Sequence, residues 1–461
     1  MKRYDCLVIG SGPGGQKAAI QAAKLGKKVA IVERSPYIGG AGLHTGTLPS
    51  KTLRETALFL TGFKQRAVFG FQFTLGRDVT LTELMYKKTE VIRKQMGVII
   101  DQFNRNNVEI IYGDASFADG HTLLVKGRTG AGEEITSDFI IIATGSRPSR
   151  PSDIPFDSEY VYDSDTILSL DAIPRSLTIV GGGIIGCEYA CIFASLGVSV
   201  NLVERKERLL AFADEEIVNS LIYWMRHSGV TLRLKEEVVK IATDGERVAT
   251  HLKSGKLILS EKLLYTMGRV GNTDTLNLEA IGIKAGARGL LTVDNGFRTA
   301  VPHIYAIGDV IGFPSLASTS MEQGRRAVCH AFEKEGLTCA IAGHLPFGIY
   351  TIPEISMVGE TEDSLSEKRV AYETGCAYFH EVARGQIIGD VHGMLKLLFD
   401  RDTRRLLGVH IIGEKASELI HIGQAVLNFG GPIDYFKDVV FNYPTLSEAY
   451  KEAALNGLNK L

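Results

Sequence analysis

The sequence lacks any C-x-x-C pair, although it contains six cysteines in 461 residues. Two of them lie in apolar segments rather than in loops. This usage predicts buried thiols in a reducing compartment rather than a disulfide framework. The six positions are Cys6, Cys187, Cys191, Cys329, Cys339 and Cys376.

Strong charge and long apolar runs are missing as well. The chain has 51 basic and 53 acidic residues and a formal charge of −2, which excludes the strong field that attracts nucleic acid or an anionic membrane. No run of about 18 apolar residues occurs, and no signal-like segment precedes the first predicted strand. We therefore expect a cytoplasmic protein with small-molecule partners and no metal.

Glycine, in contrast, is frequent, and it marks one pattern that occurs twice. A predicted strand from Asp5 to Ile9 is followed by Gly10-Ser11-Gly12-Pro13-Gly14-Gly15, a predicted helix from Gln16 to Leu25, and a strand that ends at Glu33. This order of strand, glycine turn, helix, strand and acid is typical of a dinucleotide-binding unit.

The second copy lies 171 residues further along the chain, so that Gly10 corresponds to Gly181 and Glu33 to Glu204. In such a unit the glycines let the backbone approach a pyrophosphate, the helix N-terminus faces its charge, and the acid accepts hydrogen bonds from a ribose. One copy is weak evidence, but two copies with the same flanking pattern predict two Rossmann-like domains.

The remaining segments predict further structure and at least two domains, because the chain exceeds the roughly 250 to 300 residues at which one core stops growing. Leu81 to Phe103 has the pattern of a long amphipathic helix. The proline-rich run from Arg147 to Pro155 is a predicted boundary. From about Pro346 strands and helices alternate as in an α+β domain, with predicted helices from Lys415 to Leu427 and from Leu446 to Leu458.

The segment from Gly39 to Lys51, GGAGLHTGTLPSK, is a predicted glycine-rich loop that runs into a helix near Lys51. It resembles the redox-active segment of the flavoprotein disulfide reductases, the family of dihydrolipoamide dehydrogenase and glutathione reductase, whose pattern is G-G-x-C-x-x-x-x-C-x-P-x-K. The resemblance extends to Ala143-Thr144-Gly145, Gly308-Asp309 and the C-terminal segment from Phe441 to Glu448.

The resemblance implies FAD in the first Rossmann-like domain, NAD(H) or NADP(H) in the second, and a C-terminal dimerisation domain. The domains implied are 1–150 and 271–345 for FAD, 151–270 for NAD(P), and 346–461 for dimerisation. Lys51 would lie beside the flavin and pair with Glu188, near the nicotinamide. The implied cofactor-binding residues are Gly10, Gly12, Gly14, Gly15, Glu33, Arg34, Gly40, Gly42, Thr47, Lys51, Ala115, Thr144, Gly145, Asp309, Ala317, Gly181, Gly183, Ile185, Gly186, Glu188, Glu204, Arg205 and Gly268.

Two departures from the family pattern agree with each other. Gly42 and Thr47 stand where the two redox cysteines belong, and Tyr443 stands where the family has a histidine that exchanges a proton with the thiol. A phenol with a pKa of about 10 is a poor base for thiols at neutral pH. The resemblance leaves Lys51, Glu188, Tyr443 and Glu448 as catalytic candidates, the last two supplied across a homodimer.

A chain that keeps both cofactor sites and no dithiol is similar to the soluble, Si-specific pyridine nucleotide transhydrogenases, a branch of the same superfamily. Segments that carry this similarity are Gly312 to Ser318, Gly348 to Ile355 and Phe441 to Thr445. The similarity implies hydride transfer between NADPH and NAD⁺ by a ping-pong route through FAD.

Other interpretations remain open at this point. Glu204 disfavours a 2′-phosphate, although Arg205, Lys206 and Arg208 could supply positive charge or be a solvated cluster. An NAD(P)H:quinone reductase or diaphorase could use His44 and Tyr443 as proton donors, although a structural hydrogen bond is the simpler role for His44. A non-catalytic sensor of the nicotinamide redox state is the third interpretation.

Overall fold

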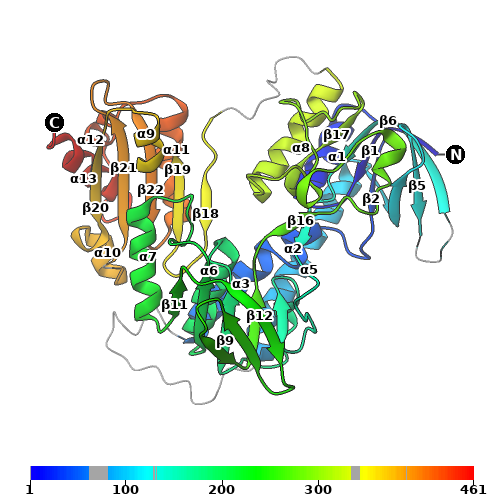
Figure 1. Cartoon of the computed structure of the whole chain (residues 1–461). Coiled ribbons are helices and arrows are strands. Elements are labelled where there is room, and N and C mark those ends of the chain that lie inside the picture. Colours follow the sequence, from blue (N-terminus) through cyan, green and yellow to red (C-terminus); the bar gives the residue numbers. More distant parts are fainter. Residues whose placement is uncertain (1, 62–80, 128–129, 131, 334–342, 391) are drawn as a thin grey trace.

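The computed structural model describes the chain except for residues 1, 62–80, 128–129, 131, 334–342 and 391. Cys339 therefore lies outside the described residues. Figure 1 shows three groups of elements: one that contains the first glycine turn, one that contains the second, and a C-terminal group. No helix among the described residues is long and apolar enough to cross a membrane.

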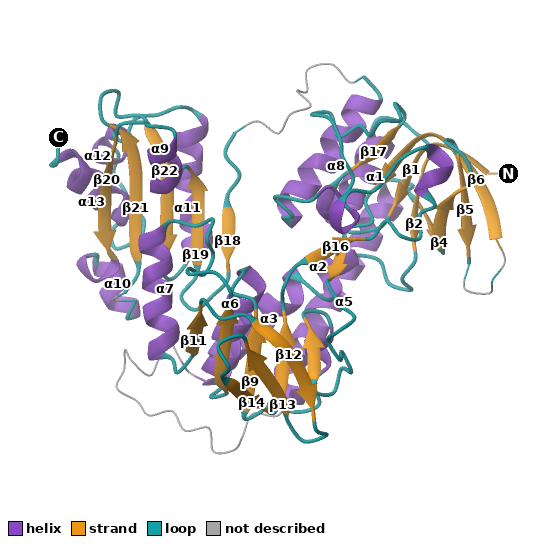
Figure 2. Ribbon diagram, viewed as in Figure 1, coloured by secondary structure: helices purple, strands orange, loops and turns teal. Residues whose placement is uncertain are grey.

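The first group is built on a sheet. In this sheet the strands before and after the first glycine turn and its helix, β1 and β2, pair in parallel. Its strand order is β3-β2-β1-β6-β5-β4, and β17 pairs with β6. Figure 2 shows α1 and α8 next to this sheet. The bounds are β1 Lys2–Ile9, α1 Pro13–Lys24, β2 Val29–Glu33, β3 Glu109–Tyr112, β4 Asp114–Phe117, β5 Thr122–Lys126, β6 Gly132–Ile142, β17 Ile304–Ala306 and α8 Ala317–Ala331. Between β2 and β3 lie α2 Gly40–His44, α3 Thr47–Thr61 and α5 Leu81–Arg105, and α3 packs beside α6 of the second group (Figure 2).

The second group repeats the design with the order β11-β10-β9-β15-β8, all paired in parallel. A three-stranded antiparallel sheet, β12-β13-β14, adjoins it, and the pair β7 with β16 links the two groups. The bounds are β7 Ser146–Pro148, β8 Val161–Asp163, β9 Ser176–Val180, α6 Ile184–Ser195, β10 Ser199–Glu204, α7 Glu215–His227, β11 Thr231–Leu234, β12 Val238–Thr243, β13 Val248–Leu252, β14 Leu257–Ser260, β15 Lys262–Tyr265 and β16 Arg269–Gly271.

The C-terminal group is a five-stranded antiparallel sheet, β18-β19-β22-β21-β20, with α11 and α13 packed on it. The predicted α/β class, with two Rossmann-like sheets and a C-terminal α+β part, is confirmed. The bounds are β18 Phe347–Ile349, β19 Ile355–Gly359, α9 Glu362–Glu367, β20 Tyr372–Tyr378, α10 Ala383–Ile388, β21 Met394–Asp400, β22 Leu406–Ile412, α11 Ala416–Asn428, α12 Asp434–Asp438 and α13 Glu448–Leu458.

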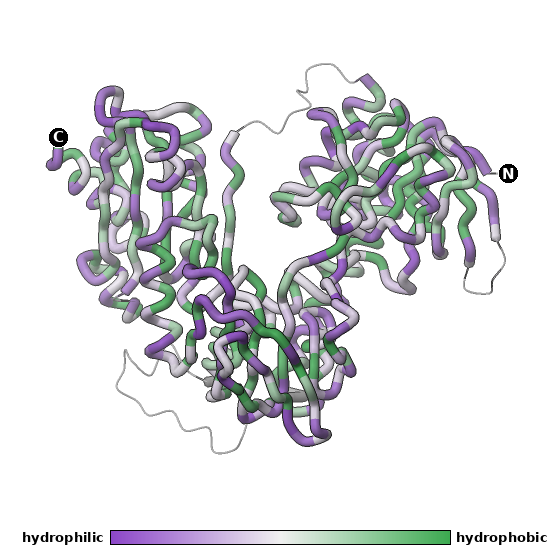
Figure 3. Tube along the Cα trace, viewed as in Figure 1, coloured by the Kyte–Doolittle hydropathy of each residue, from purple (hydrophilic) through white to green (hydrophobic). Residues whose placement is uncertain are grey.

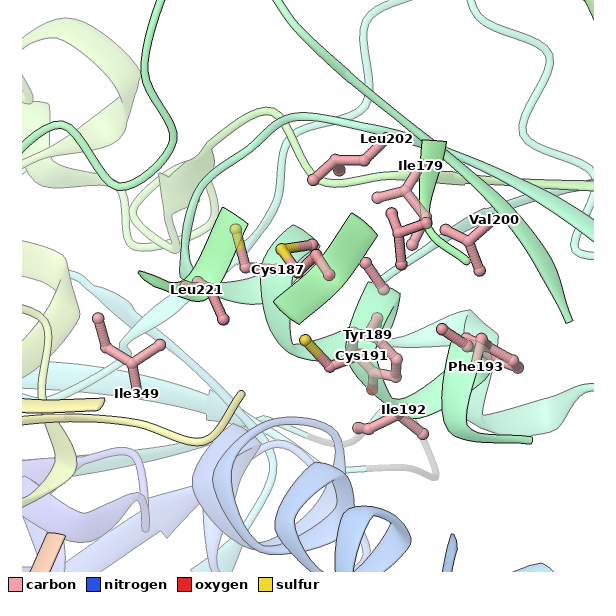
Figure 4. Packing of buried hydrophobic residues seen from close by; sticks show 14 of the residues in the cluster. Ile179, Cys187, Tyr189, Cys191, Ile192, Phe193, Val200, Leu202, Leu221 and Ile349 are labelled. Carbon is pink, nitrogen blue, oxygen red and sulfur yellow. The ribbon is translucent and has the colours of Figure 1, made fainter. Parts of the chain in front are cut away.

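Hydrophobic packing connects these groups. Figure 3 shows green, hydrophobic stretches along the strands of all three groups. One buried cluster includes Leu53 of α3, Cys187 and Cys191 of α6, and Ile349 of β18. Figure 4 labels Cys187, Cys191 and Ile349. Burial of apolar surface is the main favourable term in folding. This cluster therefore fixes three segments that are remote in sequence against one another.

A buried lysine joins the second group to the C-terminal sheet. Lys396 of β21 is 1% exposed, and its ammonium lies 3.1 Å from Asp214 and 3.0 Å from Glu216, with Glu362 also in contact. Burial alone lowers the pKa of Lys396, but the hydrogen bond to Glu362 and the charge of Asp214 raise it above its ordinary value. Lys396 is therefore charged and paired across the interface between the two groups.

His410 of β22 lies beside this cluster and is fully buried, with Nε2 2.8 Å from the carbonyl oxygen of Glu360. Burial lowers its pKa below 6.5. In the unfolded chain the imidazole of His410 binds a proton near pH 6.5, whereas in the folded chain it stays neutral. The free energy of unfolding therefore decreases as the pH falls below 6.5, by at most about 1.4 kcal/mol per pH unit.

We expect the melting temperature of His410→Gln to fall less than that of the wild type between pH 7.5 and 5.5. Equal losses in the two proteins would contradict this assignment.

Candidate active site

An ion pair between two remote helices lies at the centre of the candidate site. Nζ of Lys51, in α3, lies 2.6 Å from Oε2 of Glu188, in α6. The side chain of Glu188 is 4% exposed and that of Lys51 is 25% exposed. Removal of one member of such a pair leaves an uncompensated buried charge, which is strongly destabilising. The pair therefore joins a partly exposed cation to a buried anion.

The first glycine turn lies between β1 and α1, and its shape excludes a side chain at Gly10 and at Gly15. Gly10 has a φ of 102°, and a Cβ added to Gly15 would lie within 3.0 Å of the carbonyl oxygen of Gly10. Glu33, at the end of β2, is 6% exposed and accepts hydrogen bonds from the backbone N–H and the hydroxyl of Ser11 at 2.9 and 2.6 Å. The acid thus holds the turn in place.

The second turn, between β9 and α6, repeats this geometry. Gly181 has a φ of 111°, and a Cβ added to Gly186 would approach the carbonyl oxygen of Gly181 within 3.0 Å. Glu204 accepts from the backbone N–H of Gly182 at 2.6 Å and from that of Lys206 at 2.8 Å. The repeat seen in the sequence is therefore also a repeat of backbone geometry.

Both turns leave room for a ligand. A Cβ added to Gly12, Gly145 or Gly183 would meet no heavy atom of the protein within 4 Å. Close to the first turn, the buried hydroxyl of Thr144 has no hydrogen-bond partner among the described residues. Open glycine positions at a helix N-terminus and an unpaired hydroxyl fit a dinucleotide with a pyrophosphate. The residues present fit FAD at the first turn and NAD(P) at the second.

The other predicted cofactor-binding residues occupy varied places. A Cβ added to Gly40 would lie 2.7 Å from Cα of Gly12, and one added to Gly14 would lie 2.9 Å from the carbonyl oxygen of Ser320. Asp309 accepts a hydrogen bond from Ser146 at 2.8 Å. Arg34 and Arg205 are exposed, Ala115 is buried in β4, Ile185 lies in the first turn of α6, Ala317 begins α8, and Gly268 has a φ of 93°.

The segment from Gly39 to Lys51, predicted as a loop, is largely helical in the structure. The predicted helix start near Lys51 is wrong, because α3 begins at Thr47 and the N–H of Ser50 already bonds to the carbonyl of Gly46. Pro49 is compatible with this start, since first-turn N–H groups need no partner within the helix. The predicted open loop also contains the short helix α2, whose Leu43 is 3% exposed.

No thiol in the described part of the chain replaces the missing pair. Four of the described cysteines are free, namely Cys6, Cys187, Cys191 and Cys376, and Cys376 is the only one of these four that is not fully buried. The fifth described cysteine, Cys329, is buried as well. Burial raises the pKa of Cys6 and that of Cys191 to about 12. A thiolate is the reactive form of cysteine, so these thiols are unreactive at neutral pH.

The basic residues that follow Glu204 divide into two sets. Arg208 is held in ion pairs with Asp363 at 2.8 Å and Glu215 at 3.1 Å. Arg205 and Lys206 are exposed beside Glu204. Arg208 thus links the second group to α9 through its ion pairs. Of the three basic residues, Arg205 and Lys206 are the two that are exposed to solvent next to Glu204.

His44 has a structural hydrogen bond, as the simpler interpretation predicts. Its Nε2 lies 2.8 Å from the carbonyl oxygen of Ile38. Tyr443 and Glu448 lie before and at the start of α13, and the side chain of Tyr443 is 75% exposed. Among the described residues, no recorded hydrogen bond or ion pair joins either of them to Lys51 or Glu188 of the same chain.

Sequence reasoning missed two residues of this site. Ser11 bridges the first turn, since its hydroxyl donates to Glu33 and accepts from the N–H of Gly39 at 2.8 Å. Its place between two glycines of the motif was a usable signal. Tyr350, beside β18, donates its backbone N–H to Oε1 of Glu188 at 2.8 Å. No spacing rule relates it to residues 162 positions earlier.

Two family models match the chain. The model described as pyridine nucleotide-disulphide oxidoreductase matches residues 4–324, and the model of the dimerisation domain of the same family matches residues 345–454. The first match includes Lys51, Glu188 and both glycine turns. The second includes the C-terminal sheet.

Full-length relatives carry a more specific name. Proteins named soluble pyridine nucleotide transhydrogenase are 50% identical in Mycobacterium bovis, over 100% of this chain and 98% of the relative, and 47% identical in Colwellia psychrerythraea, over 99% and 98%. Among solved structures, LpdA from Mycobacterium tuberculosis aligns with a TM-score of 0.91 at 27% identity. The flavoprotein disulfide reductase RclA from Escherichia coli aligns with a TM-score of 0.88 at 28% identity. Both alignments cover 99% of each chain.

Proposed function

This chain belongs to the pyridine nucleotide-disulphide oxidoreductase family, and we propose that it is an FAD-dependent, Si-specific transhydrogenase that transfers hydride between NADPH and NAD⁺. The observation that carries the proposal is the ion pair between Lys51 and Glu188. Lys51 lies one turn after Thr47 in α3, and Gly42 and Thr47 stand in place of the redox cysteines. Relatives named as transhydrogenases support it.

Members of this family use FAD and NAD(P). Gly10, Gly12, Gly15, Glu33 and Thr144 would hold FAD, and Gly181, Gly183, Gly186 and Glu204 would hold the nicotinamide nucleotide. Bound FAD supplies a ring that can accept hydride from one nicotinamide and return it to another. With glycine at position 42 and threonine at position 47, this segment offers no disulfide as a competing acceptor.

The residues of the chain contribute electrostatics and order. The ammonium of Lys51 stabilises negative charge that develops near it, and the carboxylate of Glu188 fixes the ammonium in place. The second glycine turn would bind both nicotinamide nucleotides in succession. The first product must therefore leave before the second substrate enters. The expected kinetic pattern is therefore ping-pong, with parallel lines in double-reciprocal plots.

Glu204 would set the balance between the two nucleotides. Its carboxylate repels a 2′-phosphate, while Arg205 and Lys206 attract one. We expect Glu204→Gln to raise the ratio of kcat/KM for NADPH to that for NADH by about tenfold, because glutamine removes the charge and keeps an acceptor for the N–H of Gly182. Glu207→Gln, at a side chain that is 77% exposed, is the matched control. An unchanged ratio would refute the ribose assignment of Glu204.

The proposal includes a homodimer, since the C-terminal part matches a dimerisation domain. Tyr443 and Glu448 would then lie at the partner's flavin, which agrees with the exposure of Tyr443 in a single chain. Catalytically active monomers in sedimentation would contradict the dimer.

We also propose that the chain is divided into domains at 1–150, 151–270, 271–345 and 346–461. We propose that the protein is located in the cytoplasm.

The decisive experiment is the anaerobic rate of hydride transfer from NADPH to thio-NAD⁺ by purified, FAD-loaded protein. Turnover without any added quinone is the expected result. If NADPH bleaches the flavin but turnover is absent, the proposed acceptor is wrong, and quinones become the acceptors to test.

A further inference from the structure

The segment between β18 and β19 reaches from the C-terminal sheet into the candidate site. The backbone N–H of Tyr350 donates to Oε1 of Glu188 at 2.8 Å, while Oε2 of the same carboxylate holds Lys51 at 2.6 Å. Both oxygens of the buried carboxylate are therefore engaged, one by each segment. This arrangement fixes the plane of the carboxylate.

The ring of Tyr350 also contacts the other member of the pair. Nζ of Lys51 lies 5.0 Å from the ring centroid, within the roughly 6 Å at which an ammonium is attracted to an aromatic face. Ser50 adds one weak hydrogen bond at 3.4 Å. Lys51 is thus held between a carboxylate and an aromatic ring.

Several contacts keep Tyr350 in this place. The preceding residue, Ile349, is 1% exposed and belongs to the same buried cluster as Cys187 and Cys191 of α6 (Figure 4). On the other side, Nε of Arg54, one turn beyond Lys51 in α3, donates to the carbonyl oxygen of Thr351 at 3.0 Å.

A buried ion pair completes the anchor. Nη1 of Arg54 lies 3.3 Å from Oε1 of Glu354, and the side chain of Arg54 is 3% exposed. Glu354 is in turn fixed in the C-terminal group, because its carbonyl oxygen accepts from the N–H of Gly413 at 2.8 Å and its carboxylate accepts from Ser417 at 3.0 Å. The position of Tyr350 is therefore set by the C-terminal sheet and α11.

From these contacts we infer that Tyr350 is a positioning residue for hydride transfer: its backbone orients Glu188 and its ring confines the ammonium of Lys51. The inference rests on the proposed function in one respect, that the ion pair lies where hydride is exchanged. Electrostatic stabilisation is effective only when the charge is held in place before the reaction. The C-terminal sheet of the chain's own subunit thereby contributes to the site.

The test compares Tyr350→Leu, which removes the ring, with Tyr350→Phe, which keeps it. We expect Tyr350→Leu to lower kcat for NADPH and thio-NAD⁺ about tenfold with KM changed less than about twofold, and Tyr350→Phe to retain kcat within about threefold. Tyr86→Leu, on α5 at a side chain that is 67% exposed, is the control without effect.

A second measurement does not depend on turnover. In the apoprotein, the rate at which an amine-acylating reagent labels Lys51, followed by peptide mass spectrometry, is expected to rise about fivefold in Tyr350→Leu and to stay near the wild-type rate in Tyr350→Phe. If Tyr350→Leu folds poorly, Tyr350→Met fills the space with a flexible apolar chain and serves the same comparison.

Two outcomes would overturn the inference. In the first, Tyr350→Leu has the kcat and the Lys51 labelling rate of the wild type. In the second, Tyr350→Phe loses as much kcat as Tyr350→Leu, which would assign the effect to the hydroxyl. Failure of the proposed function is distinguishable. In that case the wild type itself lacks turnover with thio-NAD⁺, while the labelling comparison still tests Tyr350.

Discussion

Replacement of Lys51 by alanine is expected to lower kcat for hydride transfer from NADPH to thio-NAD⁺ by about 100-fold or more. Loss of one preorganised group that stabilises developing charge typically reduces kcat by about 10² to 10³. Lys51 is the cation that the described structure places on the buried carboxylate of Glu188, at 2.6 Å. The measurement is steady-state kcat on FAD-loaded protein.

Stability has to be separated from catalysis in this variant, because Lys51→Ala leaves the carboxylate of Glu188 buried without its cation. The double variant Lys51→Ala/Glu188→Gln removes that charge and is expected to recover most of the lost melting temperature but none of the turnover. Lys94→Ala, at a side chain that is 64% exposed, controls for the loss of a surface charge. A Lys51→Ala enzyme within threefold of the wild type would show that Lys51 has no catalytic role.

Replacement of Gly12 by alanine is expected to yield a folded protein that has lost FAD. The added Cβ meets no protein atom within 4 Å, and the φ of Gly12 is −64°, so the fold itself accepts alanine. The open space is where the pyrophosphate would approach the backbone. We expect at least about a 100-fold increase in the Kd for FAD, measured by fluorescence titration of the apoprotein, with the melting temperature of the apoprotein changed by less than about 3 °C.

Three further glycines make this result specific. Gly15→Ala is expected to disrupt folding, because its Cβ would lie within 3.0 Å of the carbonyl oxygen of Gly10. Gly183→Ala, the counterpart of Gly12 in the second turn, should keep FAD and lose NADPH binding. Gly97→Ala, in the middle of α5 with nothing within 4 Å, should bind normally. Full FAD occupancy in Gly12→Ala would show that the cofactor does not contact this turn.

Much of the fold followed from local pattern. Glycine turns, capped helices and apolar strands are specified by neighbouring residues, and the two copies of the unit reinforced each other because corresponding residues occupy corresponding places. Gly10 and Gly181 have the same left-handed backbone, and Gly15 and Gly186 approach the same carbonyl. Element ends were less certain: α3 begins four residues before the predicted start, because a proline that seemed to precede the helix is accommodated in its first turn.

The sequence by itself determined the fold class, the duplicated dinucleotide-binding unit and the absence of thiols at positions 42 and 47, since each of these is written in consecutive residues. It also pointed to Lys51 and Glu188, but only through resemblance to a family. Tertiary structure alone decided three contacts. These are the ion pair of Lys51 with Glu188 across 137 positions, the hydrogen bond from the backbone N–H of Tyr350 to Glu188, and the ion pair of Arg208 with Asp363. The physical reason is that burial of apolar surface in a shared cluster, not any local propensity, brings α3, α6 and β18 together.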